Sequence, residues 1–211
     1  MKTSSLAAPS QSEDLPLPVR GNKYPASGVR YYHDYLMDPL TALKDKHCTL
    51  IEELYSIDRQ LGWLESSGPE KAPKILVRLL GCGERLAGDL SLHFQREERA
   101  LYPVLEKRLG NNTEPVVVMK QEHRRLLNCM KSFTSEVSRM IREHDAIKTW
   151  ALSSALQDLR SDLSDHMSRE ERVLFWLADL HLSRGDRNKV CFELARMSKP
   201  SEPPESKLGF Y

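Results

Sequence analysis

Apolar residues recur along most of this chain at alternating intervals of three and four positions, the spacing that places side chains on one face of an α-helix. Helix-breaking residues divide the pattern into four long segments, expected at about 39–64 (with Asp38 as N-cap and Pro39 first in the helix), 70–109, 113–144 and 145–183. A short fifth helix is expected at 186–197. Because the connections between the long segments are short, consecutive helices are expected to be antiparallel. The pattern therefore predicts an all-α fold, an up-down-up-down four-helix bundle with a short extra helix at its C-terminal end.

The two ends of the chain lack this periodicity. Residues 1–30 are rich in serine, proline and glycine and contain few aromatic residues, a composition typical of flexible segments. Residues 198–211 have a similar composition. We therefore predict a flexible N-terminal arm at 1–30, a bundle domain at 31–197 and a flexible C-terminal tail at 198–211.

Each long segment has one apolar stripe that is expected to face the interior. The first stripe begins at Leu36, ahead of the expected start of its helix. Polar residues interrupt each stripe once, and in chain order they are His47, His93 with Glu97, His123, and His166 with Glu170. Beyond these patches, the second and fourth stripes are expected to continue inward through Ala100 and Val104, and through Val173, Leu177 and Leu180.

These polar patches point to metal binding. Burying two carboxylates and four imidazoles without partners is costly, so such groups pair, change protonation or bind metal. Counting residues from the turns places the patches at one depth to within about six residues, roughly 9 Å along a helix. A lone buried histidine is usually a satisfied core residue, but its occurrence on every stripe favours a shared site. Imidazole and carboxylate ligands suit iron, manganese or zinc, so the ligand types leave the metal open.

The composition argues against several other classes of protein. The 211-residue chain has a formal net charge of +1, and its acidic and basic residues are interleaved, which does not favour nucleic-acid binding. No apolar stretch approaches the ~18 residues of a membrane span, and the N-terminal sequence lacks the apolar region of a secretory signal. The four cysteines are scattered, without a Cys-x-x-Cys pair. We therefore expect a cytoplasmic protein that binds neither nucleic acid nor membranes.

The six polar residues, taken in order, resemble the hemerythrin-like (HHE cation-binding) family. The Asp-Pro-Leu sequence at 38–40 and the run HFQREERALYP at 93–103 add to the resemblance, which covers roughly 36–183. It implies two iron ions in a non-haem di-iron site, joined by an oxo or hydroxo bridge and bridged also by Glu97 and Glu170. Manganese or zinc remains open as an alternative.

One departure from the family pattern bears on activity. Oxygen-carrying hemerythrins have a further histidine one turn along the third helix, where this chain offers Met119 and Leu127. The resemblance therefore implies a more symmetric site, with two histidines and two bridging carboxylates for each metal. In this the chain resembles the di-iron proteins of iron–sulfur cluster repair and nitric-oxide response, although residues 1–30 contain no cysteine, unlike the N-terminal domain of those proteins.

Two functions fit these features. The first is a redox-active protein that binds or reduces a small oxidant (oxygen, peroxide or nitric oxide) under redox or nitrosative stress. It leaves open whether the protein is a di-iron oxidoreductase of peroxidase-like, catalase-like or nitric-oxide-reducing type. The alternative is an iron- or redox-sensing or iron-handling module that acts through a redox or regulatory protein partner without turnover. No catalytic residue is assigned.

Several residues adjoin the expected ligands. Glu98, Glu122 and Glu171 can relay protons or orient imidazoles, although an exposed salt-bridging role is the simpler interpretation. Tyr102 can hydrogen-bond a bound ligand or simply fill the bundle. The histidines expected to lie outside the metal layer are His33, His144 and His181.

Overall fold

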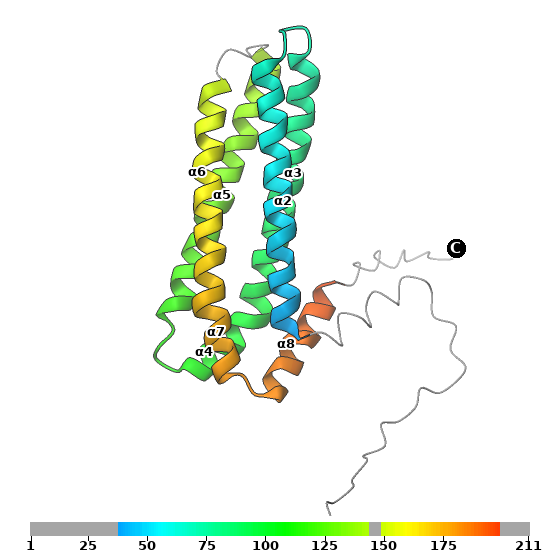
Figure 1. Ribbon diagram of the computed structural model, residues 1–211. Helices are drawn as coiled ribbons and strands as arrows, with labels where there is room; N and C mark the ends of the chain where they lie inside the picture. The colour runs from blue at the N-terminus through cyan, green and yellow to red at the C-terminus, as the bar shows by residue number, and fades with distance from the viewer. Residues whose placement is uncertain (1–37, 144–148, 199–211) are drawn as a thin grey trace, which may run out of the picture.

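A computed structural model describes residues 38–143 and 149–198, and within these ranges the protein contains helices and no strand (Figure 1). The predicted all-α class is therefore confirmed. The elements are α2 (Pro39–Ser66), α3 (Ala72–Arg96), η1 (Glu97–Leu101), α4 (Tyr102–Leu109), α5 (Glu114–Glu143), α6 (Thr149–Arg169), η2 (Glu170–Phe175), α7 (Trp176–His181) and α8 (Arg184–Met197).

The long helices α2, α3, α5 and α6 lie side by side (Figure 1). Helix α2 packs against α3 and α6, and α5 packs against the same two helices, so the helices close a ring around the core. Helix α8 contacts α2, η1 and α4 at one end of this ring. None of the helices in the two described ranges has an apolar stretch long enough to cross a membrane.

The helix boundaries follow local sequence signals. Helix α2 begins at Pro39, as predicted, because proline lacks the N–H that the first turn leaves unbonded. Asp38 makes no capping hydrogen bond and instead accepts one from Arg187 of α8. Helix α8 begins with a capping box, in which the Ser183 hydroxyl accepts from the Asp186 N–H and the Asp186 carboxylate accepts from the Ser183 N–H.

Several predictions lie outside the described residues. These are the arm at 1–30, residues 199–211 of the predicted tail, Leu36 of the first stripe, and the boundary expected between the third and fourth helices at 144–145.

The second and fourth predicted helices are not continuous α-helices. Each contains a short π-helix, η1 or η2, that begins at the glutamate of its His-x-x-x-Glu pair. In η1 the Tyr102 N–H donates to the Glu97 carbonyl five residues earlier. Pro103 favours this break, because it has no N–H to donate and its ring crowds the carbonyl four residues before it. No proline lies within η2, and the sequence offers no comparable reason there.

The π-turns change which residues face the interior. A π-turn holds one more residue than an α-turn, so the inward stripe moves along by one position. Ala100 is buried as predicted, but Val104 and Leu177 are only partly buried, and Val173 and Leu180 are exposed. The predicted stripe therefore holds at Ala100 but is wrong after it in the second helix, and it is wrong beyond Glu170 in the fourth. The buried residues there are Leu101, Tyr102 and Leu105 after η1 begins, and Leu174, Phe175 and Ala178 after η2 begins.

The core consists of two apolar clusters. The larger fills the space between the long helices and includes Leu54, Leu86, Met130 and Leu159. The smaller lies toward α4, α7 and α8 and includes Leu40, Leu101, Leu105, Met119, Phe175 and Val190. The six polar residues of the interrupted stripes belong to neither cluster and are themselves buried.

Candidate metal centre

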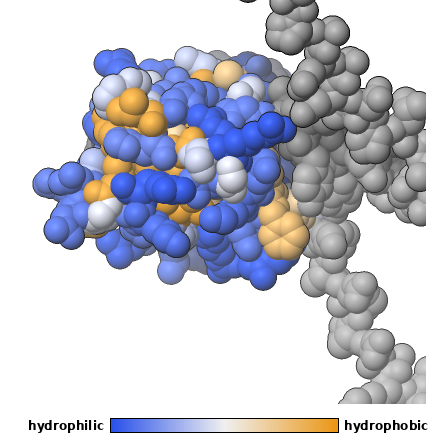
Figure 2. Space-filling model, turned by 90° about the horizontal axis from the view of Figure 1, so that it is seen from below, coloured by the Kyte–Doolittle hydropathy of each residue, from blue (hydrophilic) through white to orange (hydrophobic). Residues whose placement is uncertain are grey.

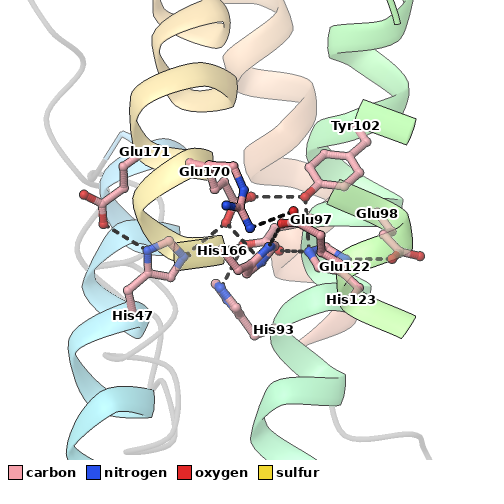
Figure 3. Close-up of polar contacts among 11 residues, drawn as sticks. His47, His93, Glu97, Glu98, Tyr102, Glu122, His123, His166, Glu170 and Glu171 are labelled. Carbon is pink, nitrogen blue, oxygen red and sulfur yellow. Dashed lines mark hydrogen bonds and ion pairs between the residues drawn. The ribbon is translucent and has the colours of Figure 1, made fainter. Parts of the chain in front are cut away.

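The structure brings the six predicted residues together in one layer inside the bundle (Figure 3). Each of the long helices α2, α3, α5 and α6 contributes to it, directly or through the π-turn that follows, because each stripe carries its polar residues at the same depth. None of the six is more than 4% exposed. They are His47 of α2, His93 of α3, Glu97 of η1, His123 of α5, His166 of α6 and Glu170 of η2.

The four imidazoles form two pairs with Glu97 between them. The ring centroids of His47 and His93 are 4.9 Å apart, and those of His123 and His166 are 4.8 Å apart. Glu97 Oε1 faces the first pair, at 2.8 Å from His93 Nε2 and 3.9 Å from His47 Nε2. Its other oxygen, Oε2, lies 3.4 Å from His123 Nε2 in the second pair. Glu97 therefore offers one oxygen to each pair of histidines.

Glu170 is arranged differently. Its Oε2 lies 3.3 Å from His47 Nε2 and 4.0 Å from His166 Nε2, so this one oxygen faces both pairs. Its Oε1 accepts a hydrogen bond from the Tyr102 hydroxyl at 3.1 Å, and the same hydroxyl lies 3.3 Å from His123 Nε2. Tyr102 is fully buried, so it both fills the bundle and orients a carboxylate of the layer.

The layer holds buried polar atoms without partners, which is the physical test of whether a cation fits. In the described part of the chain, these atoms make no hydrogen bond although each is shielded from solvent. Leaving such a group unsatisfied costs about 1–3 kcal/mol, and a bound cation removes that cost for several at once. Ligand atoms of His47, His93, Glu97 and Glu170 lie within 4.8 Å of one another. The unpartnered atoms are His47 Nε2, both nitrogens of His93, both carboxylate oxygens of Glu97, His166 Nε2 and Glu170 Oε2.

Carboxylates outside the layer hold three of the four imidazoles. In each case the ring Nδ1 hydrogen-bonds to a glutamate, which leaves Nε2 directed at the centre of the layer (Figure 3). Such partners fix the tautomer and increase the basicity of a metal ligand. These pairs are His47–Glu171 at 3.0 Å, His123–Glu98 at 2.7 Å and His166–Glu122 at 2.9 Å. Each of the three glutamates therefore contacts an imidazole in a position to orient it, and does not form exposed salt bridges alone.

The three glutamates differ in their surroundings. Glu122 is the most buried, with 14% of its side chain exposed, and it also pairs with Arg169 at 2.8 Å. The side chains of Glu98 and Glu171 are 36% and 49% exposed. Among the described residues, His93 has no such partner, because its Nδ1 makes no hydrogen bond.

Sequence reasoning missed two aromatic residues of the site. The ring of Phe94 stacks on His123 with centroids 3.9 Å apart and planes 6° apart, and it meets His166 edge-on at 5.5 Å. Phe175 stacks on His47 at 5.8 Å. The position of Phe94 next to His93 in the sequence was a weak signal that it belongs to the site. No such signal existed for Phe175, which faces inward only because of the π-turn.

Charge distribution in the metal-free layer follows from burial. Burial raises the pKa of Glu170, and the neighbouring Glu97 carboxylate raises it further. Burial would also raise the pKa of Glu97, but the imidazoles of His93 and His47 outweigh it and lower that pKa. Burial alone would lower the pKa of His47, yet the adjacent Glu170 and Glu97 carboxylates raise it to about 10. The adjacent buried carboxylates thus require positive charge, which a proton or a metal ion supplies.

His123 shows the opposite behaviour. Burial lowers its pKa to about 3, with a further lowering from the nearby His166 and His93. Opposed pKa shifts within one buried cluster are typical of functional sites. Of the histidines set aside from the sequence, His181 is exposed beside Asn111 and Pro115, and His33 and His144 lie outside the described residues.

The fold and the site define the class of this protein. Residues 38–178 match the family model of the hemerythrin HHE cation-binding domain. This match covers well over half of the chain, and the chain therefore belongs to the hemerythrin HHE cation-binding family.

Among curated proteins, the chain is similar to iron-sulfur cluster repair proteins YtfE. The protein of Escherichia coli (strain K12 / DH10B) is 31% identical over 136 residues, which cover 62% of this chain and 59% of the relative. The protein of Shigella boydii serotype 18 (strain CDC 3083-94 / BS512) matches with the same identity and coverage. The chain thus spans about three fifths of the length of the curated relatives that it matches.

Proposed function

We propose that the protein is a di-iron protein of the stress response that binds or reduces a small oxidant. His47 and His93 would hold one iron, His123 and His166 would hold the other, and Glu97 and Glu170 would offer carboxylate oxygens to both. The observation that carries the proposal is the set of buried ligand atoms without hydrogen bonds, which face one another within the layer. We also propose that the four long helices run antiparallel and that α8 is an addition at the C-terminal end of the bundle.

The choice of iron rests on the donor set and on the relatives. Mixed imidazole and carboxylate ligands suit iron, manganese or zinc. The similarity to proteins named for iron–sulfur cluster repair favours iron and a role under stress. When bound, iron would supply a Lewis acid and an electron donor for oxygen, peroxide or nitric oxide.

The surroundings of the site favour a small ligand. Apolar clusters lie on both sides of the layer, and Phe94 and Phe175 pack directly on its imidazoles. These groups limit access by water and by larger molecules. The buried Tyr102 hydroxyl keeps Glu170 in place, and Glu98, Glu122 and Glu171 keep three imidazoles directed inward.

Elemental analysis followed by reaction with oxidant tests the proposal. We expect two iron ions per chain in the purified protein, loss of iron in Glu97→Gln, and full iron content in Glu52→Gln, an exposed control on α2. The diferrous protein should then change its visible absorbance and consume peroxide or nitric oxide. Protein without stoichiometric metal, or loaded protein that consumes no oxidant, would contradict the proposal.

The second candidate is an iron or redox sensor that acts through a protein partner without turnover. The observation that favours it is the position of α8, which contacts η1, the turn that carries Glu97. Occupancy of the site can then alter the packing of α8, because metal binding couples to folding. Hydrogen exchange of α8 with and without iron distinguishes the two. A sensor shows iron-dependent protection of α8 and no consumption of oxidant.

A further inference from the structure

An apolar stripe lies exposed on η2 and α7. It consists of Val173, Trp176 and Leu180, which are 38%, 59% and 62% exposed. These residues are three to four positions apart and therefore share one helix face, which we call the η2–α7 face. The adjacent Leu174, Phe175 and Ala178 are fully buried, so the π-turn leaves this face directed away from the core.

The face forms part of the surface at one end of the bundle. Figure 2 views the molecule from the end where α7 and α8 lie and shows apolar groups interrupting a mainly hydrophilic surface. A tryptophan and a leucine that share one exposed helix face form a contiguous apolar area rather than scattered residues. Such areas on monomeric proteins commonly mark contact sites.

The start of α2 lies beside this face. The Asp38 carboxylate binds Arg187 Nη1, and Arg187 Nη2 binds the Asp179 carboxylate at 2.9 Å. Asp179 is on α7, next to Leu180. These two ion pairs link Asp38, the residue before α2, to α7 through the side chain of Arg187.

The seven residues before Asp38 match the face in composition and length. Residues 31–37 read YYHDYLM and contain three tyrosines, a leucine and a methionine. Extended chain spans at most about 3.3–3.6 Å per residue, so these residues reach about 23 Å. The stretch from Val173 to Leu180 is about 10 Å long at helical rise. Arg172 borders the face without an ion-pair partner among the described residues, and Asp34 is the acidic residue of the segment.

We propose that residues 31–37 fold back from Asp38 and dock on the η2–α7 face, covering Trp176 and Leu180. The segment is the chain's own, so its local concentration at the face is high and no second molecule is required. This docking involves the surface of the bundle and does not depend on whether the buried layer binds iron.

Trp176 provides a direct probe of this docking. Trp63→Phe with Trp150→Phe leaves Trp176 as the only tryptophan of the full-length chain. In this background we expect acrylamide to quench Trp176 weakly. Leu36→Ser with Met37→Ser should increase the quenching constant about two- to threefold, while the control, Leu6→Ser with Leu15→Ser, should leave it unchanged. All variants are compared at the same iron content. Equal, strong quenching in every variant overturns the proposal, and so does shielding that disappears on dilution, which would indicate a second copy of the chain.

A reciprocal experiment uses substitutions that cannot affect the core. Trp176→Ser with Leu180→Ser changes only exposed side chains, so the bundle remains folded. Docking predicts that this variant is cleaved by chymotrypsin after Tyr35 several-fold faster than the unmodified protein, with no change at Leu6. Equal cleavage after Tyr35 in both proteins overturns the proposal.

Discussion

Replacing Phe94 tests whether an aromatic ring holds the imidazoles in place. Phe94 is 2% exposed and stacks on His123 with nearly parallel planes, 3.9 Å between centroids. Truncating a buried phenylalanine to alanine costs about 3–5 kcal/mol, whereas a volume-conserving swap costs below about 1.5 kcal/mol. For Phe94→Leu we therefore expect the unfolding free energy of the metal-free protein to fall by about 1–3 kcal/mol.

Loss of the stack has a separate effect on metal binding. An aromatic pair contributes about 0.5–1.5 kcal/mol beyond the area it buries. Without Phe94, His123 must be ordered by the metal itself, so the same energy is lost from binding. A loss of this size corresponds to an affinity for the metal that is about 2- to 13-fold weaker, which competition with a chelator measures.

Phe133→Leu is the matched control. Phe133 is also 2% exposed and belongs to the same apolar cluster as Phe94. It is ten residues from His123 on α5, about 15 Å along the helix. Both variants should lose similar stability in urea unfolding of the metal-free protein, but only Phe94→Leu should lose metal affinity. Equal loss of affinity in both would refute the positioning role, because general loosening of the core would then explain it.

Three further outcomes are expected. Glu122→Gln should weaken metal affinity about 10-fold or more, as removal of such ligand-orienting carboxylates does, and chelator competition should show no effect for Glu52→Gln. Tyr102→Phe leaves Glu170 Oε1 without its donor, so urea unfolding of the metal-free protein should show a loss of about 1–3 kcal/mol; an unchanged midpoint would contradict this role. Because the pKa of His47 is raised from 6.5 to about 10, its stabilisation of the metal-free protein is fully present below pH 6.5 and is lost as the pH rises toward 10. Unfolding at pH 6.5 and 9.5 should therefore differ less in His47→Gln than in the unmodified protein.

The sequence by itself determined the helices and the depth of the polar layer. Burial repeats every three to four residues in a helix that faces a core, and the buried residues of α5 follow this expected spacing without a break from Val116 to Met140. The same periodicity placed all six polar residues inward, and the start of α2 at Pro39 followed from a local rule about unbonded N–H groups. These features depend on near neighbours in the chain.

Only the tertiary structure decided what happens beyond the two glutamates. The π-turns move the inward stripe by one residue, which buries Phe175 and exposes Val173, and periodicity assumes α-helical turns throughout. Contacts between helices likewise fixed which glutamate orients which imidazole, as with Glu171 and His47, 124 residues apart. Such pairings depend on the rotation and separation of packed helices, and a pattern read along one helix contains no information about either.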